Sequence, residues 1–424
     1  MLRYLKLILA VGVLASTTVA LAAEPSMEDM QKTIAELQAR LKAQQERLNQ
    51  IEGKVDEDMK SEMAKVAREL ADDAGKHAAM PGWLDNLKFF ADLRLRYQND
   101  CGDDDGGGPS FNVPGSRRQK NRNRARFRLR FGFIKTWLDE QFEVGFRLAS
   151  GDPANATSAN QTFTNIFSRK EIDIDWAYAK YAPKCVPGLA VIGGKMPNPL
   201  VHTDMVWDSD VNPEGFVVAY SRPFGPIEPF GSVGFFIVNE LGPTFDQQYD
   251  TTLWSYQAGF NWDVCDGVRN TFAATYYDYD HMTLLLGEQF QCINVTNKVG
   301  FSVMKIPVSV YGDLIYNCNF DNRLNGDSDQ DKGCAVGVKV GRNEKKGDWS
   351  VFYKWAYIEA FATPGVLNDS DFNGSNSKGH VIGGCYNITD FLTVGARVFL
   401  TEVISGAAEG VDEVTTQIDM VWKL

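Results

Sequence analysis

Every second residue is an arginine at the start of the stretch Arg122-Asn123-Arg124-Ala125-Arg126-Phe127-Arg128-Leu129-Arg130-Phe131-Gly132-Phe133. From Ala125 onward, the residues between the arginines are apolar. Successive side chains of a β-strand point to opposite faces, so the stretch predicts a strand with one cationic and one apolar face. An arginine that faces lipid near the middle of a bilayer costs about 2–4 kcal/mol. If this strand crosses a membrane, its five arginines must therefore face the inside of a barrel.

Two other interpretations of this stretch stay open. The arginines could form the solvated face of a soluble sheet, or part of a basic arm for nucleic acid, because eight Lys or Arg fall within residues 117–130. The interleaved Phe127, Leu129, Phe131 and Phe133 argue against a flexible arm.

The same period of two recurs along most of the chain after Gly82. Each such segment predicts a strand with one apolar and one polar face. The fold class predicted is all-β, an antiparallel transmembrane β-barrel of about 16 strands (range 14–18). The clearest strands cover 89–98, 124–133, 142–148 and 171–178, and further candidates cover 188–196, 214–222, 228–239, 251–263, 268–280, 292–303, 306–318, 333–342, 347–358, 378–388, 390–402 and 412–424.

The connections between these strands alternate in length, which is typical of outer-membrane barrels with long external loops and short periplasmic turns. An even number of strands places both ends of the barrel on the turn side. Long connections lie near 99–121, 150–169, 197–213, 240–250, 281–291, 319–332, 359–377 and 403–411, and short ones near 135–139, 182–187, 223–227, 264–267, 304–305, 343–346 and 389.

Composition excludes several classes of protein. The 424 residues carry 43 basic and 55 acidic side chains, a net charge of −12, which argues against a nucleic-acid binder. After residue 23 no apolar run approaches the ~20 residues of a membrane-spanning helix. The 26 Phe, 15 Tyr and 9 Trp leave open a soluble β protein or a membrane β-barrel. Seven cysteines without a C-x-x-C pair, and four histidines without metal spacing, predict neither a metal site nor a cofactor.

The N-terminus has the pattern of a secretory signal peptide over residues 1–22. Arg3 and Lys6 precede an apolar stretch, and Ala20-Leu21-Ala22 supplies a small-residue cleavage site. Domain boundaries predicted from the sequence are 1–22 for the signal peptide, 24–80 for a helical segment with its linker, and 85–424 for the barrel.

The helical segment shows the alternating steps of three and four residues that are typical of a coiled coil. A single amphipathic helix packed on a domain is the alternative. Ile34 at an a position, Ile51 at a d position and Gln44 in the core favour a trimer over a dimer. The seam comprises Met27, Met30, Ile34, Leu37, Leu41, Gln44, Leu48, Ile51 and Val55.

Four stretches carry a resemblance to a known family: Ala91-Asp92-Leu93-Arg94-Leu95-Arg96-Tyr97, Arg124 to Gly132, Gly145-Phe146-Arg147-Leu148-Ala149-Ser150-Gly151, and Trp207-Asp208-Ser209-Asp210-Val211-Asn212-Pro213-Glu214-Gly215. The chain from about residue 85 resembles bacterial outer-membrane porins of the putative-porin family, distantly similar to the phosphate-selective porins. A leading coiled coil is common in similar chains. The terminal alternation Ile418, Met420, Trp422 and Leu424 resembles the signal read by the barrel-assembly machinery, although Leu424 replaces the usual aromatic residue.

Further polar side chains are expected to line the pore beside the five arginines. Arg94 and Arg96 precede them on the first strand, and Arg147 follows on the third. Asp173 and Asp175 lie on the polar face of the fourth strand and would temper an anion preference. A row of fixed cations lowers the barrier for anions and raises it for cations, so we expect some anion preference.

The third long connection carries Asp204, Asp208 and Asp210, with Glu214 just after it. In porins that the chain resembles, the third external loop folds into the barrel and narrows it. The resemblance therefore implies a constriction in which these carboxylates face the arginines. An ordinary acidic exterior loop is the alternative.

The sequence predicts a porin, a passive channel for small hydrophilic solutes and ions across the outer membrane of a Gram-negative-type bacterium. Its partners would be outer-membrane lipid, two further copies in a homotrimer and the barrel-assembly machinery, with no nucleic acid and no enzymatic activity. The coiled coil would lie in the periplasm. The main alternative is a structural protein with a narrow or plugged barrel, whose coiled coil tethers the envelope, for example to peptidoglycan. A soluble secreted β protein is a third possibility.

Overall fold

The computed structural model divides the chain into two units, Met1–Asp85 and Asn86–Leu424. It describes residues 32, 36, 38–43, 84–102, 121–164, 166–240, 249–282, 289–319, 330–406 and 409–423. In the first unit, residues 32, 36 and 38–43 are helical. The predicted signal peptide and most of the predicted coiled-coil seam lie outside the described residues, and both stay predictions.

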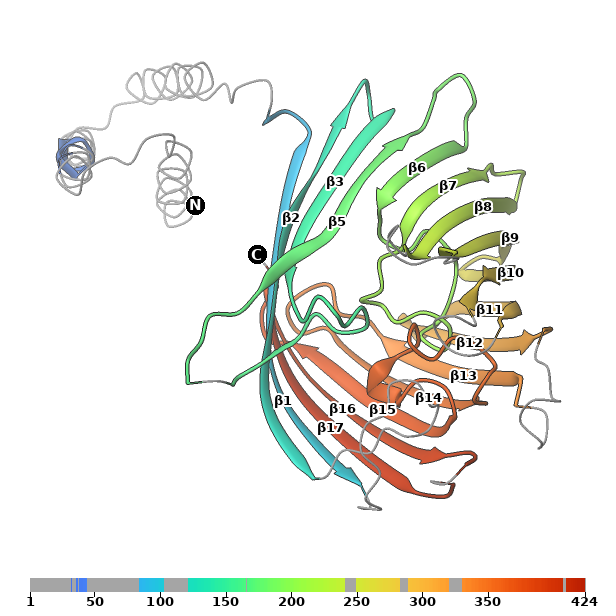
Figure 1. Cartoon of the computed structure of the whole chain (residues 1–424). Helices are drawn as coiled ribbons and strands as arrows, with labels where there is room; N and C mark the ends of the chain where they lie inside the picture. The colour runs from blue at the N-terminus through green and yellow to red at the C-terminus, as the bar shows by residue number, and fades with distance from the viewer. Residues whose placement is uncertain are drawn as a thin grey trace. The chain divides into compact units, whose positions relative to one another are not determined.

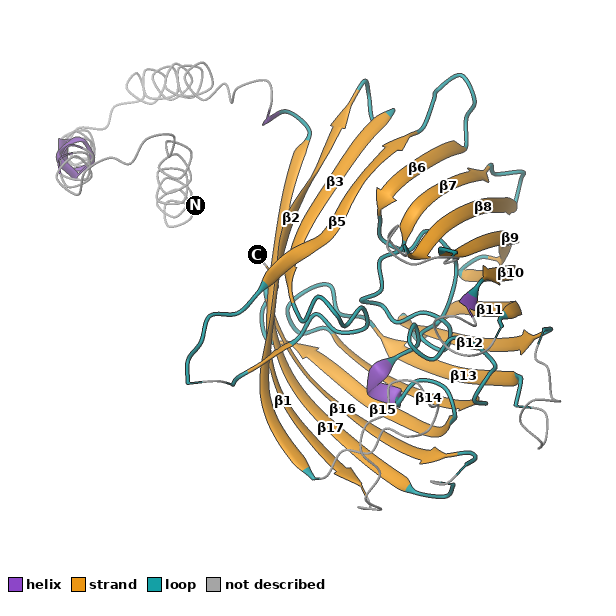
Figure 2. Ribbon diagram, in the orientation of Figure 1, coloured by secondary structure: helices purple, strands orange, loops and turns teal. Residues whose placement is uncertain are grey.

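The second unit confirms the predicted antiparallel β-barrel: sixteen strands form its closed wall, and β4 is a short additional strand (Figures 1 and 2). Among the described residues, no helix is both long and apolar enough to cross a membrane. The strands are β1 (Leu87–Gly102), β2 (Arg122–Trp137), β3 (Phe142–Ser150), β4 (Gln161–Thr162), β5 (Ile172–Tyr181), β6 (Leu189–Lys195), β7 (Glu214–Ser221), β8 (Ile227–Asn239), β9 (Thr251–Cys265), β10 (Val268–Asp280), β11 (Gln291–Val303), β12 (Ile306–Asn317), β13 (Lys332–Gly341), β14 (Trp349–Ile358), β15 (Ser377–Asn387), β16 (Leu392–Val403) and β17 (Asp412–Lys423).

The barrel closes where the last strand pairs with the first. β17 lies antiparallel to β1 from the pair Asp92–Lys423 to the pair Gly102–Glu413. β1 also pairs with β2, so both of its edges are hydrogen-bonded. A closed sheet is one of the two ways to satisfy every backbone group of a chain in lipid.

The predicted alternation of long and short connections is also present. β11 and β12 are joined by Met304 and Lys305 alone, and both have positive φ angles, of 50° and 69°. This is the backbone that a two-residue hairpin turn requires. Three long connections matter below and are named loop 2 (residues 151–171), loop 3 (196–213) and loop 7 (359–376).

Loop 2 completes the barrel wall where β3 is short. β3 pairs with β2 from Arg130 to Trp137, and β4 within loop 2 pairs with β2 at Arg126 and Phe127. The described residues that follow β4, 163, 164 and 166–171, leave the wall and project away from it (Figure 1). Ile166 and Phe167 in this projection are 97% and 102% exposed.

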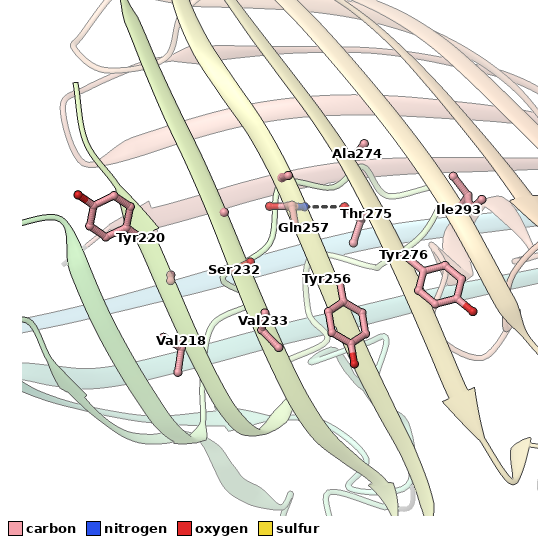
Figure 3. A pocket seen from close by; sticks show the side chains of 13 residues that line it. Val218, Tyr220, Ser232, Val233, Tyr256, Gln257, Ala274, Thr275, Tyr276 and Ile293 are labelled. Carbon is pink, nitrogen blue, oxygen red and sulfur yellow. Dashed lines mark hydrogen bonds between the residues drawn. The ribbon is translucent and has the colours of Figure 1, made fainter. Parts of the chain in front are cut away.

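The outward face of the wall is apolar. Leu95 and Tyr97 of β1 are exposed, while the arginines between and beside them are buried. An outward groove of about 700 Å³ crosses β7 to β11 (Figure 3). Among the side chains that line it are Val218, Tyr220, Val233, Tyr256, Tyr276 and Ile293.

The inside of the barrel has an apolar half, which the sequence analysis did not predict. Phe236 of β8, Leu253 of β9 and Tyr277 of β10 point inward and are at most 2% exposed. They pack with Met205 and Trp207 of loop 3 in one hydrophobic cluster that also contains residues of loop 7. Loops 3 and 7 therefore occupy the barrel on this side (Figure 1).

The outward position of Val310, in the middle of β12, gives a test of which face meets lipid. Val310 is 43% exposed. We expect Val310→Arg to lower the free energy of unfolding of the bilayer-inserted barrel by about 2–4 kcal/mol, because the guanidinium would face hydrocarbon. Met304→Arg, in the turn that precedes β12, is the control, with an expected loss of about 0–1 kcal/mol. Equal losses in urea titrations of the two variants would contradict a lipid-facing β12.

Candidate functional site

Six arginines on β1 and β2 form an arginine wall: Arg94, Arg96, Arg124, Arg126, Arg128 and Arg130. Arg94 and Arg128 are direct partners across the two strands, and so are Arg96 and Arg126. These four are at most 9% exposed and lie on the inner face. Like charges directly opposite each other destabilise a sheet, so this wall requires counter-charges.

Carboxylates from β1 and β17 supply part of that counter-charge. Asp419 accepts two hydrogen bonds from Arg96, at 2.7 and 2.9 Å. Asp100 accepts one from Arg124 at 2.7 Å. Asp92 lies between Arg128 and Arg130 and accepts from each at 2.8 Å. The wall is therefore held by short, charge-assisted hydrogen bonds.

The other arginines and aspartates predicted for the pore lie on neighbouring strands. Arg147 of β3 donates to Asp175 of β5 at 2.5 Å, and its guanidinium stacks 3.6 Å from the centre of the Trp176 ring. Asp173 lines a cavity of about 580 Å³ beside loops 2 and 3. Arg122 is the first residue of β2 and is exposed.

Loop 3 lies inside the barrel and brings its aspartates to two different places. Asp210 lies 3.7 Å from Arg128 and 3.6 Å from Arg130. Asp204 accepts a hydrogen bond at 2.8 Å from Lys354 of β14, which is 5% exposed. Glu214 is instead the first residue of β7, and it pairs with Lys195 at 2.7 Å.

Loop 7 is the part of the site that the sequence analysis missed. Its Asp371 lies 3.1 Å from Arg96, and its Asp369 lies 3.5 Å from Lys354. Backbone hydrogen bonds join it to loop 3, from Asp208 N to Leu367 O at 2.7 Å and from Asp369 N to Asp204 O at 3.1 Å. Lys354 thus bridges the two loops through one carboxylate of each.

A signal for loop 7 was present in the sequence. Asp369-Ser370-Asp371 repeats the triplet Asp208-Ser209-Asp210 of loop 3. In both triplets the first aspartate accepts a hydrogen bond from the backbone amide two residues later, at 3.0 and 2.8 Å. This is the local turn that aspartate favours, and it points the second carboxylate of each triplet toward the arginine wall.

Burial makes the first aspartate of each triplet hard to ionise. Asp208 is 8% exposed, and burial together with the charge of Asp369 raises the pKa of its carboxyl to about 8. Burial also raises the pKa of Asp369, to about 6, although Lys354 opposes the shift. For Asp371, burial opposes ionisation, but the charges of Arg96, Arg126 and Arg94 and a hydrogen bond with Gln417 together lower the pKa.

A cavity of about 330 Å³ lies between the wall and the two loops. It adjoins the 580 Å³ cavity, since Ser158 and Asp210 line both. Arginines line it on the wall side, with Asp419 of β17 among them, and aspartates of loops 3 and 7 line the other side. Its charged lining comprises Arg94, Arg96, Arg128, Arg397, Asp204, Asp208, Asp210, Asp369, Asp371 and Asp419.

A family model described as "Putative porin" matches residues 19–285 and 281–423. The chain belongs to this family. Among solved structures, a high-pH form of Pseudomonas putida OprB is similar over 80% of this chain and 94% of its own, at 13% identity and a TM-score of 0.52. A Rhodopseudomonas blastica porin variant covers 80% of this chain and all of its own, at 11% identity and a TM-score of 0.42. The comparison with curated proteins finds no significant match.

Family and fold together make this protein a porin-type channel of the outer membrane. Such barrels are typically non-enzymatic. Within the described part of the chain, no group of three or more His, Cys, Asp or Glu side chains is arranged to hold a metal ion.

The raised pKa of Asp208 predicts how stability depends on pH. The folded chain keeps a proton on this carboxyl up to about pH 8, whereas the unfolded chain loses it near the ordinary aspartate pKa of 3.8. This group therefore lowers the free energy of unfolding as pH rises through that window, by up to about 1.4 kcal/mol per pH unit. We expect Asp208→Asn to lose less stability than the wild type between pH 5 and pH 8.5 in urea titrations.

The matched control is Asp139→Asn in the exposed turn between β2 and β3. Lys184 lowers the pKa of Asp139, so this group is ionised throughout the window and its removal should leave the pH dependence unchanged. An Asp208→Asn profile parallel to that of the wild type would show that Asp208 is ionised in the folded protein.

Proposed function

We propose that the protein is a passive diffusion channel for small hydrophilic solutes and ions, with its constriction between the arginine wall and loops 3 and 7. The observation that carries this proposal is the 330 Å³ cavity with arginines on one side and aspartates on the other, inside a closed barrel. Charged rings of this kind select ions and polar solutes by charge and size.

The solute path we propose runs along the wall side of the barrel. The opposite side is filled by the hydrophobic cluster of β7 to β10 and loops 3 and 7. That side is lined mainly by apolar side chains, whereas the wall side offers guanidinium, amide, hydroxyl and carboxylate groups. The short turns, and the predicted coiled coil with them, would lie on the periplasmic side.

We propose a modest anion preference. Arg96, Arg124, Arg128, Arg130 and Arg147 each lie within 4 Å of a carboxylate. Paired charges contribute little net potential at a distance, so the preference should be weaker than the number of arginines indicates. We expect no enzymatic activity.

The alternative function, a structural tether with a narrow barrel, has one observation in its favour. The apolar cluster around Trp207 and Tyr277, whose ring centres lie 6.3 Å apart, leaves less open space than a fully hydrated lumen would. A tether would need a partner for the N-terminal segment, such as peptidoglycan.

Conductance of the detergent-extracted full chain in a planar bilayer tests the proposed channel. Under a KCl gradient we expect stepwise conductance and a reversal potential displaced modestly toward that of chloride. A displacement toward potassium would mean that the aspartates of loops 3 and 7 dominate the constriction. Folded protein that does not conduct would contradict the proposed channel and favour the structural tether.

We also propose that the protein is a homotrimer in which the projection of loop 2 contacts a second copy. Ile166 and Phe167 are fully exposed on that projection. An exposed apolar patch is one of the features that mark contacts with another protein or with a membrane, and we assign this one to a second copy. The coiled-coil pattern of residues 27–55 points independently to three chains.

Phe167→Asp tests this contact. We expect it to weaken association by about 2 kcal/mol or more, as for a central aromatic residue of an interface, and to shift trimers toward monomers in analytical ultracentrifugation. Met304→Asp, a 93% exposed residue of a turn at the opposite end of the barrel, is the control. Trimers of unchanged stability in the Phe167→Asp variant would exclude loop 2 from the interface.

A further inference from the structure

We propose that Arg94 and Arg126 form a binding site for one small oxyanion, a carboxylate or inorganic phosphate, in the constriction. The inference rests on the proposed channel, because it assigns a preferred class of solute to the same cavity. It predicts saturable passage of such anions rather than diffusion alone.

The first observation is that these two cations lack counter-charges that their neighbours have. Among the described residues, neither Arg94 nor Arg126 has a carboxylate oxygen within 4 Å, whereas the other four arginines of the wall do. Both are 9% exposed. An uncompensated charge at such burial is costly, and an anion between the two guanidinium groups would offset that cost.

The second observation is that neutral groups hold these arginines and leave donors open. Asn160 Oδ1 accepts from Arg94 Nη2 at 2.7 Å. Arg126 donates to Gln98 Oε1 at 3.0 Å, to Ser158 Oγ at 3.2 Å and to the carbonyl of Asn160 at 3.5 Å. The Nε of each arginine is buried without a hydrogen-bond partner, and the same is true of Arg124 and Arg128.

The third observation is that the two arginines converge. Arg96 pairs with Arg126 and Arg94 with Arg128, so Arg94 and Arg126 are diagonal neighbours on one face of the sheet. Both reach Asn160, which loop 2 brings over the wall and which lines the 330 Å³ cavity with Arg94. One anion beside Asn160 can therefore contact both.

Five of the six aspartates that line the cavity lie within 4 Å of a cation other than Arg94 and Arg126. Lys354 lies between Asp204 and Asp369, Arg128 and Arg130 flank Asp210, and Arg96 binds Asp371 and Asp419. Asp208, with its pKa of about 8, is mostly protonated at neutral pH. Lys354 and Arg96 are each shared by two carboxylates, so aspartates still attract Arg94 and Arg126 from a greater distance. Arg397, which lines the cavity with Arg94, adds a further positive charge.

The chemistry of the site favours an oxyanion over a halide. The planar fork of an arginine matches two oxygens of one carboxylate or phosphate. A cavity of 330 Å³ is at the small end of ligand sites. Acetate and inorganic phosphate are therefore suitable probes. Comparing them shows whether the site binds a carboxylate or a phosphate.

The experiment measures single-channel conductance of the full chain against concentration in potassium acetate, potassium phosphate and KCl. We expect saturation with at least one oxyanion at concentrations where the chloride series is still linear. In Arg94→Gln and Arg126→Gln, half-saturation should move to about tenfold higher concentration, because each variant removes charged hydrogen bonds. Arg342→Gln, in an exposed turn, makes the same charge change away from the cavity and should saturate like the wild type.

Arg94→Lys and Arg126→Lys keep the positive charge but lose the planar fork of donors. These variants replace the glutamine variants in the same experiment if the latter do not fold. Calorimetric titration of acetate and phosphate into the detergent-solubilised protein reports binding without conduction. Saturation with acetate alone or phosphate alone supports the site and names its ligand. A conducting wild type that is linear in both oxyanions and binds neither would overturn the site and leave the channel standing. A protein that binds an oxyanion but does not conduct would support the binding site and contradict the proposed channel.

Discussion

A sheet that crosses lipid cannot leave backbone donors and acceptors unpaired, and the pairing of β1 with β17 is the constraint on which this structure depends. Closure fixes which side of every strand faces inward. Once Leu95 and Tyr97 point to the outside, Arg94 and Arg96 must point to the inside. The positions of the charged groups follow from this alternation, before any contact between them is considered.

Arginines forced into a confined interior require counter-charges, and this requirement positions the loops. Asp419 comes from the last strand, 323 positions away from Arg96, and Asp371 comes from loop 7. Lys354, on β14, holds loops 3 and 7 together through Asp204 and Asp369. The loops are thus fixed at one end by the arginine wall and at the other by Lys354. The barrel wall and loops 3 and 7 form one electrostatic network.

Most of the barrel could be predicted from the sequence because local features indicate each strand. These features are the alternation of apolar and polar residues and the length of the connection that follows. The sequence also predicted the inward face of Arg94 to Arg130 as a group, since lipid does not tolerate so many charges. It did not predict loop 7, because an inward loop is fixed by contacts such as Arg96 with Asp371 that join distant parts of the chain. Nor did it predict the apolar interior near Tyr277, because alternation alone does not say which face of an all-apolar segment packs against a loop.

Because most arginines of the wall are paired with carboxylates, two roles of these arginines become separate. One role is to hold the wall and the loops together, and the other is to create a net electric field. Arginines within hydrogen-bonding distance of carboxylates mainly organise the wall and contribute little net field, because each positive charge is offset at short range. The field available to a passing solute comes from the groups left over. In this barrel those groups adjoin the polar surface of loop 2, around Asn160, and face the path that the apolar cluster leaves open. A wall rich in arginine can therefore combine weak overall ion selectivity with strong local discrimination, and the distribution of the aspartates decides where that discrimination occurs.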